Sequence, residues 1–297
     1  MNAMSVSGKT LLMCLIMSGT LLFGQDLTFK GQFWTSVTAG DDPAPGRSDV
    51  EHTLGYIPSL SLAHQLGPMS VLDLEVAYNS GALYDGALGG GEADPDKYLR
   101  LYRLWGRFAT ESLDLRVGLQ KIAFGPGRVL RPLMWFDTFD LKDPTGQTDG
   151  VGALRLRWFP QHNLTVWGWV IRPDYREYAS PGGRIEIGLG SVETGLTYHR
   201  QQSSGLDFTG RKLLAFNDEE ERFAIDARWD GFIGLWTEAV LTRGTEPAFD
   251  DEINTSTQIM AGGDYTLPWG NGVYVTVEHL WSRIDNLAPS PPLPPYS

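Results

Sequence analysis

The chain has 297 residues with 36 acidic and 24 basic side chains, and its formal charge of -12 disfavours a nucleic-acid partner. A mean hydropathy of -0.20 excludes a bundle of transmembrane helices, which requires apolar runs of about 18 residues or more. Thirty-five glycines, 18 prolines and an aromatic content of 11% favour a folded chain of many short strands, and the single cysteine, Cys14, excludes a disulfide framework.

The first 24 residues have the pattern of a secretory signal peptide. Lys9 precedes an apolar segment over 11–23, and Gly24 follows it as a small residue suited to cleavage. The segment is too short to span a bilayer comfortably. We therefore predict that residues 1–24 are removed and that the protein is exported; a retained anchor is the alternative.

From Leu27 onward the hydrophobic pattern alternates with a period of two, which predicts strands with two different faces. Around Arg103 the alternation slips by one residue, which predicts a β-bulge. The clearest predicted strands cover 69–79, 113–120, 150–159, 183–190, 192–200, 222–230 and 272–283. Less regular strands are expected at 28–38, 57–66, 98–109, 163–171, 232–242 and 257–267, so that about 13 strands (12–14) are predicted.

Short and long connections alternate along the whole chain. The short ones are at 65–68, 110–111, 160–162, 191, 231 and 268–271, and the long ones are at 39–56, 80–97, 121–149, 172–182, 201–221 and 243–256. This arrangement is typical of an all-β, transmembrane, antiparallel up-and-down barrel of the outer membrane. A periplasmic β protein, with the apolar stripe as its core, is the alternative.

Aromatic residues favour the assignment of the apolar stripe to lipid. Tyr78 and Tyr198 end rising strands, whereas Trp158, Trp229 and Tyr265 lie near the other end of descending ones, as in the two interfacial girdles of membrane barrels. The opposite, polar stripe then lines an aqueous lumen. Its predicted pore-lining residues are Asp73, Glu75, Arg116, Arg155, Arg157, Arg184, Glu186, Asp226, Arg228 and Glu278.

The C-terminal end leaves the count of strands uneven. Single-chain bacterial barrels have even numbers of strands, and the proline-rich tail at 284–297 cannot form one. We expect residues 25–283 to form the barrel and the tail to be an extracellular loop that stops before a fourteenth strand. Parallel pairing of the first and last strands, or an error of one in the count, would also explain the number.

The connection at 121–149 is the longest, with 29 residues, and it is too apolar to stay solvated outside the barrel. We predict that it folds into the lumen and narrows it, with Arg128, Arg131, Asp137 and Asp140 at the constriction. The alternative is a capping loop that an Arg–Asp pair holds closed, with no role in permeation.

Basic residues gather just before and within this loop. Residues 98–132 contain seven basic side chains and two acidic ones in a chain that is otherwise acidic. If Arg116, Arg155 and Arg157 share one wall, they form a basic ladder that favours anions. Alternatively, these arginines pair across a narrow lumen with Asp73, Glu75 or Asp226 and fill it.

No pattern in the sequence indicates catalysis or a bound cofactor. The five histidines form no metal-binding motif, and the acidic clusters at 218–221 and 250–252 lack the ligand spacing of a calcium loop. His199 lies on an inward stripe, and the sequence offers it no catalytic partner. We predict no enzymatic activity, no cofactor and no metal.

Several segments resemble Gram-negative outer-membrane porin-like proteins: 115–127, 130–137, Asp143-Pro144, 148–151, 181–184 and 197–200. The resemblance covers about a quarter of the chain, and it implies an outer-membrane location and passive transport. We therefore predict a porin or channel that passes small polar or anionic solutes by diffusion. Its partners would be membrane lipid, the solutes and, in a homo-oligomer, copies of itself. A non-conducting scaffold or surface-binding barrel is the alternative.

Overall fold

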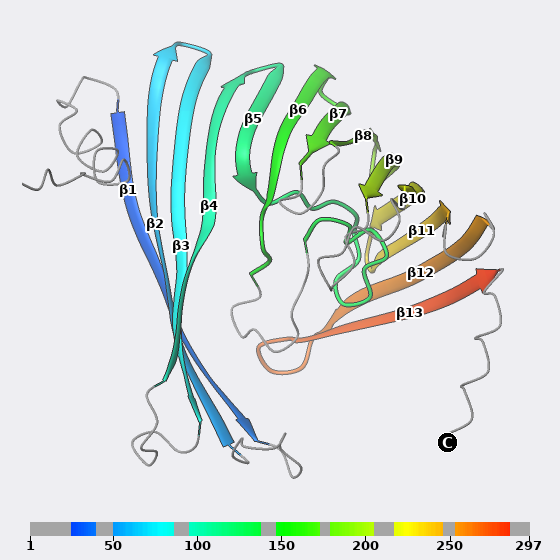
Figure 1. The fold of residues 1–297 in the computed structure, drawn as a ribbon. Coiled ribbons are helices and arrows are strands. Elements are labelled where there is room, and N and C mark those ends of the chain that lie inside the picture. Colours follow the sequence, from blue (N-terminus) through cyan, green and yellow to red (C-terminus); the bar gives the residue numbers. More distant parts are fainter. Residues whose placement is uncertain are drawn as a thin grey trace, which may run out of the picture.

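The computed structural model describes residues 25–39, 50–85, 95–137, 147–172, 179–204, 217–245 and 253–285, so the predicted signal peptide and nearly all of the proline-rich tail lie outside it. Thirteen strands form one sheet in which each strand pairs only with its neighbours in sequence (Figure 1). They are β1 (Gln25–Ala39), β2 (Val50–Gly67), β3 (Ser70–Asp85), β4 (Asp96–Thr110), β5 (Leu113–Gln120), β6 (Val151–Gln161), β7 (Leu164–Ile171), β8 (Ser180–Leu189), β9 (Val192–Ser204), β10 (Asn217–Asp230), β11 (Gly234–Thr245), β12 (Ile253–Leu267) and β13 (Val273–Asp285).

The predicted number and order of strands are confirmed. Every neighbouring pair is antiparallel, so the six tight turns all lie at one end of the strands and the longer connections at the other. In the turn between β8 and β9, Gly190 adopts a positive φ of 65°. The sheet curves strongly, and β1 and β13 are its two edges (Figure 1). The described strands include no pairing between these edges, so the parallel pairing considered above is not observed.

The predicted bulge near Arg103 is confirmed. Ala77 of β3 pairs with Arg103, and the next residue, Tyr78, pairs with Leu101, which leaves Tyr102 as the extra residue on β4. Tyr102 and Arg103 are consecutive, yet both are buried on the concave side. The bulge thus turns two neighbouring side chains inward.

The two faces of the sheet have the predicted chemistry. The convex face carries large apolar side chains such as Leu74 and Leu196, which are 47% and 56% exposed. On the concave face Asp114, Arg155 and Asp226 are buried. No helix in the described ranges has the length and hydropathy to cross a bilayer.

An apolar cluster lies inside the curve of the sheet. Ile122, Phe124 and Leu133 from the connection after β5 pack against Trp167 and Trp169 of β7. This part of the connection lies on the concave side of the sheet (Figure 1). The expected inward fold of this segment is therefore observed over residues 121–137.

The pairing of β4 with β5 predicts a sharp effect of one substitution. Gly118 has a φ of 117°, and a Cβ there would lie 2.2 Å from the carbonyl oxygen of Leu104. We expect Gly118→Ala to lower the free energy of unfolding by about 1–3 kcal/mol, measured by urea unfolding with tryptophan fluorescence. Gly168→Ala is the control, because nothing lies within 4 Å of its Cβ position. Equal effects of the two substitutions would contradict the steric argument.

Candidate functional site: the concave face and its inward loop

Glu278 of β13 holds the inward loop through its backbone. Its carboxylate accepts hydrogen bonds from three consecutive peptide N–H groups, of Arg128 at 2.8 Å, Val129 at 2.8 Å and Leu130 at 2.6 Å. The indole Nε1 of Trp236 donates a fourth at 2.9 Å. Hydrogen bonds of this kind, from backbone N–H to an ionised acceptor, are about twice as strong as neutral ones. Glu278, predicted to line the pore, is thus occupied by the loop.

A second carboxylate, Glu238 of β11, holds the same loop from the neighbouring part of the wall. It accepts from the backbone N–H of Gly127 at 2.7 Å and of Leu133 at 3.0 Å, and it is buried. Glycine is required close to it, since a Cβ on Gly125 would lie 2.5 Å from its Oε1 atom. Glu238 was not among the predicted site residues. The sequence could have indicated its inward position, because Glu238 shares one face of β11 with Trp236 and Val240.

The predicted constriction residues do not form one group. Arg131 donates to Asp137 at 2.9 Å, and Asp137 is buried. Burial raises the pKa of the Asp137 carboxyl above its ordinary value, although Arg131 beside it opposes that shift. Arg128 instead contacts Asp264 of β12 at 3.1 Å. Asp140 lies outside the described residues.

Three arginines stand side by side on the wall formed by β4, β5 and β6. In the register of the sheet, Arg107 pairs with Arg116, and Arg116 pairs with Arg155. Asp73 on β3 ends the row and accepts from Nε of Arg107 at 2.6 Å. Asp114 lies 3.4 Å from both Arg107 and Arg155. Sequence reasoning placed Arg107 in the basic segment but missed it as a lining residue.

Arg116 and Arg157 have no ion pair in the described part of the chain. The guanidinium of Arg116 lies 4.1 Å from the ring centre of Trp105, and that of Arg157 lies 4.2 Å from that of Trp167. Glu75 lies on the neighbouring wall and accepts only a long hydrogen bond, 3.5 Å, from Ser61. This wall, which we call the arginine wall (Arg107, Arg116, Arg155 and Arg157), therefore carries more positive than negative charge.

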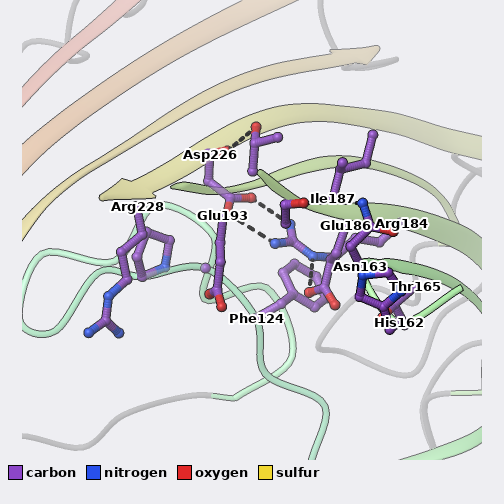
Figure 2. Close-up of a pocket in the computed structure, with 14 residues that line it drawn as sticks. Phe124, His162, Asn163, Thr165, Arg184, Glu186, Ile187, Glu193, Asp226 and Arg228 are labelled. Carbon is purple, nitrogen blue, oxygen red and sulfur yellow. Dashed lines mark hydrogen bonds and ion pairs between the residues drawn. The ribbon is translucent and has the colours of Figure 1, made fainter. Parts of the chain in front are cut away.

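Arg184 of β8 and Asp226 of β10 are fully paired instead (Figure 2). Arg184 binds Asp226 through both terminal nitrogens, Glu186 through Nε at 2.7 Å and Thr197 at 2.7 Å. Its guanidinium lies where a side chain on Gly195 would be, at 2.2 Å from the Cβ position. Asp226 thus pairs with Arg184 along one wall, and the pairing with Arg116, Arg155 or Arg157 across the lumen that was considered above is not observed among the described residues.

The described residues offer no metal site, and the inward histidine, His199, contacts a tryptophan. His199, which the sequence places on an inward stripe, is buried and accepts a hydrogen bond from Nε1 of Trp169 at 3.3 Å. Within these ranges, no group of three or more His, Cys, Asp or Glu side chains could hold a metal ion.

The fold is similar to those of outer-membrane channels. No protein-family model matches the chain, and no curated protein matches its sequence. The outer membrane channel DcaP of Acinetobacter baumannii is 11% identical with a TM-score of 0.57, over 88% of this chain and 80% of that one. The outer membrane protein OmpT of Vibrio cholerae is 9% identical with a TM-score of 0.55, over 89% and 77%. At these identities the likeness establishes the porin-like fold alone.

The bonds to Glu278 predict how the loop responds to its loss. Glu278→Ala leaves three backbone N–H groups without their acceptor, so local opening becomes easier. We expect trypsin to cleave the bond after Arg128 at least about tenfold faster than in the wild type, since each charged hydrogen bond contributes about 1.5–3 kcal/mol. Glu75→Ala, which removes a concave carboxylate that touches no loop backbone, is the control. Cleavage at the wild-type rate in Glu278→Ala would refute the anchoring role.

Proposed function

We propose that this protein is an outer-membrane channel through which small polar solutes, above all anions, pass by diffusion. The porin-like fold, the alternation of short turns with long connections and the expected signal peptide support the location. The lumen is the concave side of the sheet, and the arginine wall is the observation that carries the preference for anions.

The convex face supports contact with lipid. Its large side chains remain exposed, for example Phe33 at 68%, Leu99 at 71% and Val277 at 67%. A soluble monomer rarely exposes apolar patches larger than a few hundred Å². Trp158, near the turn end of β6, is 49% exposed and suits one interface of a bilayer, whereas Tyr78, 43% exposed, lies near the middle of β3 and not at its end as expected from the sequence. Lipid is therefore the solvent that fits this face.

The arginine wall supports selection by charge. Four guanidinium groups face three carboxylates, Asp73, Glu75 and Asp114, and two of the four have no ion pair among the described residues. Arginine offers paired N–H donors that match carboxylate and phosphate oxygens. A row of such groups lowers the barrier for an anion and raises it for a cation.

The inward loop supports selection by size. Residues 121–137 occupy part of the lumen, and the bonds to Glu238 and Glu278 hold them against β11 and β13. The arginine wall lies on β4 to β6, whereas these bonds hold the loop against β11 and β13. We infer that solutes pass between the two.

One observation favours a second candidate, a non-conducting scaffold. Phe124, Trp135, Phe136 and Trp169 pack edge to face or stack, with ring centres 5.4–5.9 Å apart for the pairs that include Phe124. Such a cluster fills lumen space on the β7 side. The absence of any conductance in a planar bilayer would favour the scaffold over the channel.

The charge of the wall is tested by Arg116→Gln. Removal of one unpaired cation should reduce the ratio of anion to cation permeability by about two- to fivefold, since fixed charges at a constriction act within a Debye length. The ratio follows from the reversal potential in a gradient of KCl. Arg283→Gln is the control, because the Arg283 side chain is exposed and lies on the opposite face of β13 from that of Glu278. An unchanged ratio in Arg116→Gln would contradict the role of the arginine wall.

The role of the loop is tested by deletion of residues 126–146. If the loop narrows the lumen, the single-channel conductance of the deletion variant should exceed that of the wild type by about twofold or more, because a wider pore holds more ions in parallel. Heat-modified mobility on a gel would show that the variant still folds. A folded variant with wild-type conductance would leave the loop as a cap without a role in permeation.

A further inference from the structure

A small recess lies between the inward loop and the strands β7 to β10, near the tight turns (Figure 2). Its volume is 380 Å³, within the range typical of sites for small ligands. Phe124, Gly125 and Pro126 of the loop form its roof. Because Glu238 fixes this part of the loop through Gly127, the roof has a defined position.

The polar groups at the back of the recess already have hydrogen-bond partners within the protein. Arg184 donates to Asp226 and Glu186, and Glu186 also accepts from the indole of Trp167 at 2.9 Å. The ring of Phe124 lies 5.3 Å from the Arg184 guanidinium and shields it. These groups shape the recess, and they have little bonding capacity left for a ligand.

The rim, in contrast, carries two opposite charges that do not bind each other. Glu193 and Arg228 are register partners on β9 and β10, yet no ion pair joins them. Within the described ranges the Glu193 carboxylate has no hydrogen-bond partner, and Arg228 uses only Nε, on Asp230 at 2.9 Å. Figure 2 shows both side chains beside the roof of the recess. His162 and Asn163 line the opposite side.

We propose that this recess binds a zwitterion of the size of a short peptide. The ligand's ammonium group would bind Glu193, and its carboxylate would bind the terminal nitrogens of Arg228. The charged groups of the recess, two arginines and three carboxylates, sum to -1, which favours a ligand with an ammonium group over a simple anion. Ile187 and Gly188 also line the recess.

The site differs from the arginine wall in position and in ligand chemistry. It uses strands β8 to β10, whereas the wall uses β4 to β6, and it requires both charges on one molecule. Binding at equilibrium does not require conduction. A protein that is silent in a bilayer yet binds the zwitterion would therefore refute the channel and uphold this site.

The test is isothermal titration of the full chain in detergent with glycylglycine. N-Acetylglycine, which lacks the ammonium group, and glycinamide, which lacks the carboxylate, are the matched ligands. We expect glycylglycine to bind at least about tenfold more tightly than either, since each charge-assisted contact is worth about 1.5–3 kcal/mol. Equal affinity for glycylglycine and N-acetylglycine, or no binding of glycylglycine, would overturn the proposal.

Two variants assign the contacts. Glu193→Gln should weaken glycylglycine by about tenfold and leave N-acetylglycine unchanged, whereas Arg228→Gln should weaken glycylglycine and leave glycinamide unchanged. Both side chains lie at the rim, so the fold should tolerate the changes, and heat-modified gel mobility checks this. Arg283→Gln is the control on the opposite face. Wild-type affinity in either rim variant would overturn the assignment.

Discussion

When a segment leaves a sheet and folds back inside its curve, its peptide N–H groups have no neighbouring strand to accept their hydrogen bonds. In this chain two carboxylates take that role. Glu238 and Glu278 together accept five backbone N–H groups, from residues 127–130 and 133. One ionised carboxylate offers several acceptor positions, so these two side chains take the place of the backbone carbonyl groups that a neighbouring strand would supply. The proposed narrowing of the lumen and the roof of the recess both depend on these bonds.

The arginines of the concave face divide into two chemical states. Arg184 donates hydrogen bonds to Asp226, Glu186 and Thr197, so its charge is neutralised by partners within the protein. Arg116 has an aromatic ring beneath it and arginines on both sides in the register. Burial of a paired charge stabilises one geometry, whereas an unpaired charge beside water attracts a counterion. The number of arginines in the sequence does not distinguish the two states; their partners do.

Much of the fold is predictable from the sequence because its determinants are local. The period-two alternation and the alternation of turn lengths predict 13 strands, and the slip at Arg103 predicts the bulge. The site is less predictable because its contacts are distant in sequence. Glu238 meets Gly127 across 111 positions, and nothing near either residue indicates the other. Likewise, the apolar composition of 121–149 places Arg128 inside but cannot tell that it contacts Asp264 and not Asp137.

Glycines on the strands β8, β9 and β12 explain how large side chains fit on the concave face. Trp169 lies against Gly182, Trp236 against Gly262 and Arg184 against Gly195, in each case 2.2–2.4 Å from where a Cβ would be. A glycine on the neighbouring strand lets each side chain lie flat along the sheet and not project into the passage. In that position Trp236 and Trp169 still reach Glu278 and His199 with their indole N–H groups. Glycine on one strand and a large side chain on the next therefore act as a unit, which keeps the wall thin and leaves room for the loop inside the curve of the sheet.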